Sequence, residues 1–376
     1  MCDGLARRCG GPIEFRLSET PCFIPGSMAT EIVSAARTLI GQLLDNPAYL
    51  AAAEALVPPE FRIAGGETRP TFFQVDFGLV RTSAGIEGRL VELQSFPSLY
   101  AFQMLLAETV RDTWGPPTLN PFLGGLTRQQ YIDIVGRAIL GSHDPEEVVL
   151  IEFEPDRQKT RPDFVATESL WGVRHVDFRS LEREGRRLFA RTDGRRTEVK
   201  RIYNRVIPDE LQKRGLTWPF PPEADLDVEW AGGPDWYCRV SKFALPWLYH
   251  PWVPRTCFLS DVANLPADRQ TWVLKPLLSF AGGGILFAPT DEQLAAIPQD
   301  QHSQFVVQER VSFAPLVDTP HGQTQIEIRV MLVRDGDDYR AVLPLGRMGR
   351  GLMMGVDHNK GLSWVGAAAV LIDESC

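Results

Sequence analysis

The segment from Trp272 to Phe287 places the strongest local constraint on the fold. A run with strand character ends in Lys275-Pro276, three glycines follow at 282–284, and a second strand begins directly after them. Glycines between two strands predict a flexible loop whose backbone N–H groups can approach a polyphosphate closely, with the lysine as a positive charge beside it. The segment lacks the GK[ST] ending of a P-loop and the GxGxxG spacing of a dinucleotide-binding turn. A glycine-rich hairpin with a surface lysine is the plain structural alternative.

Charged residues follow the glycine loop in an ordered series on the next strands. Gln308-Glu309 interrupts an apolar strand, and exposed backbone with an acidic side chain at that point suits the edge of a purine base. Glu327 and Arg329 lie two positions apart and therefore share one face of the following strand. Arg329, Arg347 and Arg350 together predict a bidentate clamp for anionic groups. Paired charges on the surface of a strand are the alternative.

Two β-rich runs nearer the N-terminus, 71–80 and 88–96, are joined by a short glycine-containing link and predict a β-hairpin. Asp76 lies in the first run, and Glu92 and Gln94 share one face of the second. Oxygen atoms of such side chains are the ligands that Mg²⁺ prefers. The hairpin is therefore a predicted magnesium site, and a plain salt bridge is the alternative.

The rest of the chain alternates predicted helices and strands. Apolar residues at spacings of three and four predict helices in 28–57, with a break near Asn46-Pro47, in 98–113 and in 128–141. Strands at 148–153 and 173–178 flank a segment with helical potential and predict a βαβ unit with a parallel strand pair, which a strand at 201–207 closes. The arginine-rich segment 181–197 is expected to form a solvated helix and turn face, and 215–257 a long Pro- and Trp-rich connection with buried aromatic residues.

Taken in order, the Lys-Pro strand, the glycine loop, the strand with an acidic end, the E-x-R strand and a closing Gly-Ala-rich strand resemble the ATP-grasp enzymes over residues 240–372. In those enzymes an acidic strand and an E-x-N metal pair come last, whereas here the hairpin with Asp76 and Glu92-x-Gln94 comes first. This order looks like the circularly permuted ATP-grasp group that includes eukaryotic glutathione synthetase and glutathionylspermidine synthase. The chain departs from that pattern at Gln94, where Asn is usual, and at Ala281, where the glutathione-synthetase pattern has a third acidic metal ligand.

The resemblance implies an α/β protein with a circularly permuted ATP-grasp fold and an inserted βαβ substrate unit. It divides the chain into five parts, each with an expected role. These are an irregular lead-in (1–27), N-terminal helices with the metal-binding hairpin (28–125), the βαβ substrate unit (126–210), the Pro- and Trp-rich connection (211–257) and the nucleotide-binding strands with the glycine loop (258–376).

The resemblance also implies roles for individual residues. Arg205 is expected to bind a substrate carboxylate, with Arg329 and Arg347 completing the catalytic set. The residues expected to bind ATP are Lys242, Lys275, Gly282, Gly283, Gly284, Gln308, Glu309 and Lys360, while Asp76, Glu92 and Gln94 are expected to hold Mg²⁺. The implied reaction joins a small-molecule or peptide carboxylate to an amine through an acyl phosphate. A non-catalytic nucleotide-binding protein and a kinase are the alternatives.

Composition limits the partners that such a protein can have. With a net charge of -9, the protein lacks the broad basic surface of proteins that bind nucleic acid or anionic membranes. The six cysteines contain no CxxC pair, which favours reduced thiols, and the longest apolar stretch, 365–372, is too short to span a bilayer. The sequence thus predicts a soluble cytoplasmic protein and leaves the identity of the substrates and the oligomeric state open.

Overall fold

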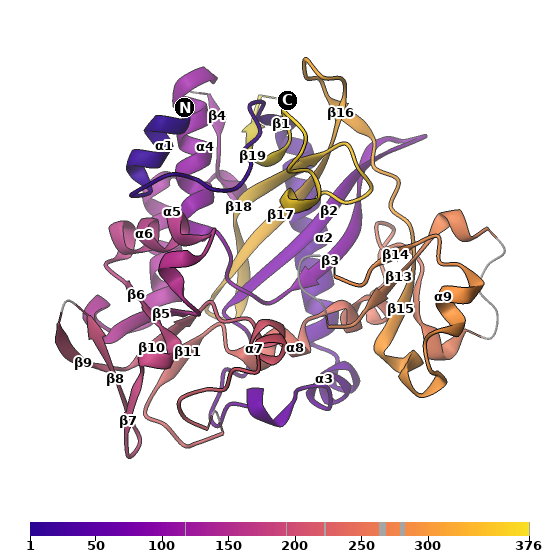
Figure 1. Cartoon of the computed structure of the whole chain (residues 1–376). Helices are drawn as coiled ribbons and strands as arrows, with labels where there is room; N and C mark the ends of the chain where they lie inside the picture. Colours follow the sequence, from indigo (N-terminus) through magenta and orange to yellow (C-terminus); the bar gives the residue numbers. More distant parts are fainter. Residues whose placement is uncertain (117, 193, 222, 263–267, 279–282, 376) are drawn as a thin grey trace.

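The computed structural model describes residues 1–376 except 117, 193, 222, 263–267, 279–282 and 376. The centre of the molecule is an eight-stranded sheet in the order β1-β19-β18-β17-β2-β3, which β16 joins at β17 and β4 joins at β19. Figure 1 shows this sheet running through the middle of the fold. Its strands are β1 (Cys22–Pro25), β2 (Phe72–Thr82), β3 (Gly85–Gln94), β4 (Leu119–Asn120), β16 (Pro315–Val317), β17 (Thr324–Asp335), β18 (Asp338–Gly349) and β19 (Gly366–Asp373).

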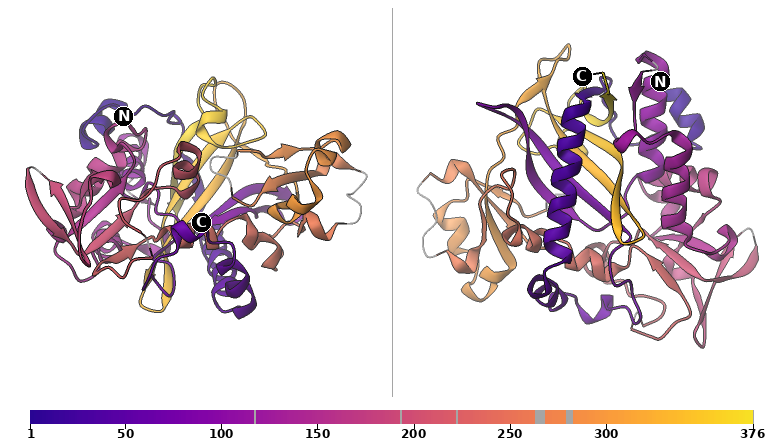
Figure 2. Two further views of the ribbon diagram at one scale, coloured as in Figure 1. Left: turned by 60° about the horizontal axis from the view of Figure 1, so that its bottom comes forward. Right: turned by 180° about the vertical axis from the view of Figure 1, so that it is seen from behind.

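Helices cover both faces of the central sheet. Alternate residues of β17 enter two different cores: Ile326 and Ile328 pack with α2, while Met331 and Val333 pack with α4 and α5. Figure 2 (right) shows α2 lying along one face of the sheet. The helices are α1 (Cys2–Arg8), α2 (Gly26–Leu44), α3 (Pro47–Glu54), α4 (Tyr100–Trp114), α5 (Arg128–Leu140), α6 (Arg161–Trp171), α7 (Pro208–Arg214), α8 (Pro234–Arg239) and α9 (Asp291–Ala295).

Two smaller four-stranded sheets flank the central sheet on opposite sides in all the views of Figures 1 and 2. One is parallel, in the order β11-β10-β5-β6, and the other is antiparallel, in the order β12-β15-β13-β14. We call the second one the small sheet. The parallel strands are β5 (Val148–Glu152), β6 (Arg174–Asp177), β10 (Arg201–Asn204) and β11 (Glu229–Ala231), and the small sheet has β12 (Thr256–Phe258), β13 (Trp272–Pro276), β14 (Leu286–Phe287) and β15 (Phe305–Glu309).

Much of this architecture follows from local signals in the sequence. The expected hairpin is β2 and β3, and the expected βαβ unit is β5, α6 and β6, with β5 and β6 parallel. The break near Asn46-Pro47 separates α2 from α3, because the Asn46 side chain accepts from the N–H groups of Ala48 and Tyr49 and proline occupies the first turn. The mixed α/β class is therefore confirmed.

Three expectations about local structure are wrong. The lead-in 1–27 is not irregular throughout, since it contains α1 and the strand β1, which pairs in parallel with β19. The segment 181–197 forms no helix among its described residues but the three-stranded sheet β7 (Glu182–Glu184), β8 (Arg187–Thr192) and β9 (Arg195–Val199). In β8, Leu188, Phe189 and Ala190 are all buried between exposed Arg187 and Arg191, and Gly185 turns the chain between β7 and β8 with φ +63°.

The third wrong expectation concerns the connection 215–257, which contains several short helices and strands. It contains the strand β11 of the parallel sheet and the helix α8. Trp230 and Trp236 are buried there, as expected for the aromatic residues of this segment. Among the described residues no helix has both the length and the apolar character needed to cross a membrane.

Candidate functional site

Four charged side chains from β2, β17 and β18 form a buried cluster on the central sheet. Asp76 and Glu327 are fully or almost fully buried, and Arg329 is only 8% exposed. Arg329 binds Asp76 in a bidentate manner, with Nε to Oδ1 at 2.6 Å and Nη2 to Oδ2 at 2.7 Å. Arg347 donates from Nη2 to both Asp76 and Glu327. We call these four residues the charge cluster.

The sheet register brings the charge cluster together. In the antiparallel pairs, Arg329 lies opposite Asp76, and Arg347 lies opposite Glu327. Glu327 and Arg329 share the face of β17 opposite to Ile326 and Ile328, as their spacing predicts. The sequence thus identifies which residues share a face, but their partners lie in strands far away along the chain.

Charge pairing controls the protonation of the cluster. Burial alone would raise the pKa of Asp76, but the Arg329 and Arg347 guanidinium groups outweigh it and hold that pKa below its usual value. Burial raises the pKa of Glu327 to about 7 in spite of Arg347. Asp76 and Glu327 in turn outweigh the effect of burial on Arg347 and raise its pKa. Asp76 is therefore the firmly ionised carboxylate of the cluster.

The other two predicted metal ligands border the charge cluster from β3. In one amide orientation the Gln94 side-chain oxygen accepts from Arg329 Nη2 at 2.7 Å and Nη1 at 2.8 Å, and in the other its Nε2 donates to Gln74 Oε1 at 2.7 Å. Gln74, which sequence reasoning did not select, accepts from Arg329 Nη1 at 2.8 Å. Glu92 lies opposite Asp76 and is 27% exposed, and its Oε1 is 3.9 Å from Arg329 Nη2. Arg329 therefore touches all three residues predicted to hold Mg²⁺.

This arrangement does not fit a divalent cation bound by all three residues. Both oxygens of Asp76 accept hydrogen bonds from guanidinium groups, and the Gln94 amide adjoins the Arg329 guanidinium. A guanidinium is a donor only, so a metal ion at the same oxygens would have to displace it. Among the described residues no group of three His, Cys, Asp or Glu side chains is placed to hold a metal ion. Of the three predicted ligands, Glu92 lies farthest from Arg329, with its Oε1 3.9 Å from Nη2.

The small sheet contributes a buried lysine that reaches the hairpin. Lys275, at the end of β13, donates from Nζ to the Val91 carbonyl at 3.1 Å and to Gln308 Oε1 at 2.6 Å. Burial lowers the pKa of Lys275 to about 8, and the nearby Glu92 partly counteracts this. Lys242 is also buried, and its charge further lowers the pKa of Lys275. The structure thus brings together the hairpin, Lys275 and Lys242, which are far apart in the sequence.

The remaining residues expected to bind ATP lie around this junction in different environments. Gln308 is buried beside Lys275, and its Nε2 has no hydrogen-bond partner among the described residues. Glu309 is 43% exposed and pairs with Arg255 at 3.4 Å. Lys360 is exposed. Gly283 and Gly284 form a turn directly before β14, whereas Gly282 and Ala281 lie outside the described residues.

Arg205, the predicted carboxylate ligand, lies at the end of β10 in the parallel sheet. It is buried and donates from Nη1 to the Pro97 carbonyl and, at 3.2 Å, to Asp163. Asp163 also accepts from the first N–H groups of α4, including Ala101 at 3.0 Å and Phe102 at 2.9 Å. Sequence reasoning missed Asp163, because its partners are apparent only once α4 and α6 pack together.

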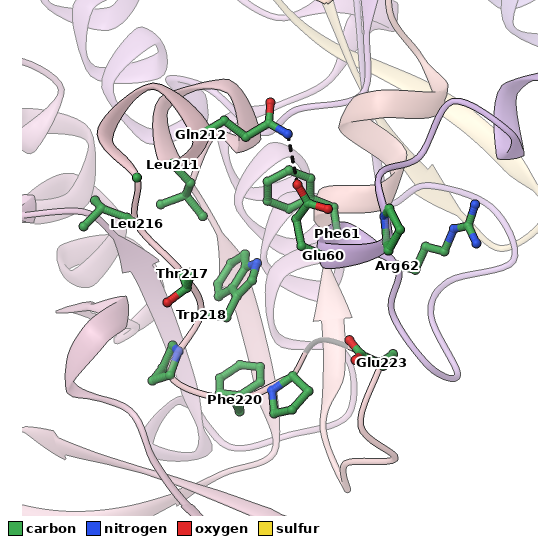
Figure 3. A pocket seen from close by; sticks show the side chains of 14 residues that line it. Glu60, Phe61, Arg62, Leu211, Gln212, Leu216, Thr217, Trp218, Phe220 and Glu223 are labelled. Atoms are coloured by element: carbon green, nitrogen blue, oxygen red, sulfur yellow. Dashed lines mark hydrogen bonds between the residues drawn. The ribbon is translucent and has the colours of Figure 1, made fainter.

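A separate cavity of about 970 Å³ lies beside α7 and the segment that follows it (Figure 3). Leu211, Trp218 and Phe220 line it, and a hydrogen bond of 3.0 Å joins Gln212 to Glu60 at its rim. None of the residues predicted to act in catalysis or binding lines this cavity. The charge cluster and Lys275 therefore lie on the central and small sheets and Arg205 lies in the parallel sheet, all outside this apolar cavity.

Comparison with known proteins finds similarity at the level of structure alone. No protein-family model matches the chain, and no curated protein matches it. Among solved structures, a glutathione synthetase-like effector from Globodera pallida in its apo form is similar, with a TM-score of 0.55. The match covers 95% of this chain and 90% of that one at 11% sequence identity. The two chains thus share a fold over most of their length.

Proposed function

We propose that this chain is an ATP-dependent carboxylate–amine ligase with a circularly permuted ATP-grasp fold. The fold is shared with a glutathione synthetase-like protein, which supports the relation to that group of ligases. The observation that carries the proposal is Lys275, a buried lysine that joins the small sheet to the hairpin. A buried ammonium group with few partners suits the binding of an anionic phosphate chain.

In the proposed reaction the protein positions substrates and stabilises charge. A substrate carboxylate attacks the γ-phosphorus of ATP, the bond to ADP breaks, and an acyl phosphate forms. The amine then attacks the acyl carbon, loses a proton and displaces phosphate, leaving an amide. In this scheme Lys275 and Lys242 would supply positive charge to the phosphates, Gln308 and Glu309 would contact the base, and Arg205 would bind the substrate carboxylate. Protein side chains form no covalent bond in this scheme.

Nucleotide binding to a Lys275→Met variant tests the proposal. Methionine keeps the length of the side chain and removes its charge, so the affinity for ATP measured by calorimetry should fall by about tenfold or more, since a hydrogen bond to a charged group contributes roughly 1.5–3 kcal/mol. Lys213→Met, at an exposed lysine of α7, is the matched control and should bind ATP like the wild type. Equal affinity in all three proteins, with circular dichroism showing that each is folded, would refute the phosphate role of Lys275.

A non-catalytic nucleotide-binding protein is the second candidate function. It is favoured by one observation, namely that Arg329 and Arg347 occupy the oxygens of Asp76. The two candidates differ in whether ADP is released when carboxylates and amines are added with ATP. Release that depends on the amine supports the ligase, and release that needs no amine indicates a kinase. Binding of ATP without any release indicates the non-catalytic protein.

A further inference from the structure

Arg329 is surrounded by oxygen atoms in the way that a bound cation would be. Its three nitrogens donate to both oxygens of Asp76 and to Gln74 Oε1, all between 2.6 and 2.8 Å, and the Gln94 amide adjoins two of them. Glu92 adds a negative charge at 3.9 Å. The set includes Asp76 and Gln94, two of the three residues whose chemistry predicts a magnesium site.

We propose that Arg329 is a built-in cation that takes the place of a divalent metal ion at the hairpin. Asp76 and Gln94 are then anchors for a guanidinium group and not metal ligands. The inference uses the proposed function only to locate the nucleotide beside the cluster, and it can be tested without nucleotide. An arginine in this position changes the chemistry of the site. The positive charge beside Glu92 is then part of the fold, whereas a metal ion would bind and leave with each nucleotide.

Burial and geometry hold the Arg329 guanidinium group permanently in place of the metal ion. Arg329 is 8% exposed and Asp76 is fully buried, so water competes little for their hydrogen bonds. The planar guanidinium matches the carboxylate with two parallel bonds and stays protonated at any physiological pH. Arg347 donates to Asp76 as well. A metal ion entering at Asp76 would have to separate one carboxylate from two arginines.

Binding of Mn²⁺ in the absence of nucleotide tests the proposal. We expect titration of MnCl₂, followed by electron paramagnetic resonance, to find no site at the hairpin in the wild type. Arg329→Ala removes the guanidinium and leaves room for a hydrated ion among the same oxygens, so its Mn²⁺ affinity should exceed that of the wild type by about tenfold or more. The gain should disappear in Arg329→Ala/Asp76→Asn. Arg334→Ala, on the same strand with its side chain bonded to the Arg69 carbonyl, is the matched control and should gain nothing.

The wild-type protein keeps the proposal falsifiable if Arg329→Ala fails to fold. A Mn²⁺ site in the wild type that Asp76→Asn abolishes, in a variant whose circular dichroism shows it to be folded, would overturn the proposal. An unchanged Mn²⁺ affinity in a folded Arg329→Ala would overturn it as well. Failure of the proposed function appears separately, as a lack of ATP binding by the wild type, and has no influence on these metal titrations.

Discussion

Glu152 shows how burial in the parallel sheet creates a pH-dependent contribution to stability. This carboxyl group lies at the end of β5, is 5% exposed, and accepts from the Phe153 N–H at 2.8 Å. Burial raises its pKa from 4.5 to about 8, although the charge of Arg205 acts in the opposite direction. Between these two pH values the unfolded chain has released the proton and the folded chain retains it. The free energy of unfolding therefore falls as pH rises through this interval.

Glu152→Gln should remove this fall, because glutamine stays neutral and its oxygen can keep the hydrogen bond to Phe153. Urea unfolding of the wild type should lose up to about 1.4 kcal/mol per pH unit more than the variant between pH 4.5 and 8. Glu223→Gln, at an exposed glutamate, is the control and should follow the wild type. Parallel stability curves for wild type and Glu152→Gln would show that the side chain ionises in the folded state as it does in the unfolded chain.

The start of β19 illustrates how a single glycine permits an element to pack. Gly366 has φ +113°, and a Cβ at this position would lie 2.2 Å from the Arg16 carbonyl oxygen. The same carbonyl accepts from the Ala367 N–H at 3.0 Å, so the lead-in is fixed against β19 at this point. We expect Gly366→Ala to reduce the free energy of unfolding by about 2 kcal/mol or more, because it combines backbone strain with a clash against main chain.

Chemical denaturation of Gly366→Ala beside Gly361→Ala checks this expectation. Gly361 lies five positions earlier, and a Cβ there would meet no atom within 4 Å. The Gly361→Ala variant should therefore retain the stability of the wild type. If both variants unfold at the same denaturant concentration, the backbone at Gly366 adapts freely and the lead-in does not limit it.

The elements differ in how far the sequence determines them. The hairpin, the βαβ unit and the break before Pro47 follow from period, turn residues and capping, which are local properties. The segment 181–197 was expected to form a solvated helix and turn face because of its many charges, whereas β8 buries three residues in a row, Leu188, Phe189 and Ala190. The strand β1 is only four residues long, and its partner β19 lies near the other end of the chain. Such pairing has no signature in either segment alone.

At the scale of the whole molecule, the junction between the sheets was anticipated through the resemblance and not through local patterns. Nothing in the residues around Lys275 indicates that it contacts Val91, 184 positions earlier. The order of motifs supplied this expectation. A salt bridge at the hairpin was the alternative to a metal site, but its partner Arg329 was not anticipated, because the register of β2 against β17 is set by packing across the complete sheet. Residue types could therefore be predicted for the site, but their partners could not.

The small sheet depends on a much smaller core than the sheet it faces. Its own cluster among the described residues has four buried side chains, Leu259, Trp272, Leu274 and Val307, and Val306 packs into one of the two large cores that cover the faces of the central sheet. Regions with few buried apolar contacts open at a lower free energy than the rest of a protein. We therefore expect the small sheet to open locally while the central sheet stays closed.

Hydrogen exchange measured strand by strand tests this expectation and its link to nucleotide binding. Without nucleotide, the amides of β13 and β15 should exchange faster than those of β17, which is buried on both faces between two helical layers. ATP bound where Lys275 meets the hairpin would bridge the small sheet and the central sheet, so the small sheet could open only after ATP is released. At a hundredfold excess over its dissociation constant, ATP should therefore raise the free energy of opening of β13 and β15 by about 2.7 kcal/mol. If β13 and β15 exchange as slowly as β17 before ATP is added, the expectation that the small sheet opens locally is wrong. Exchange that stays fast after ATP binds would place the nucleotide away from the junction.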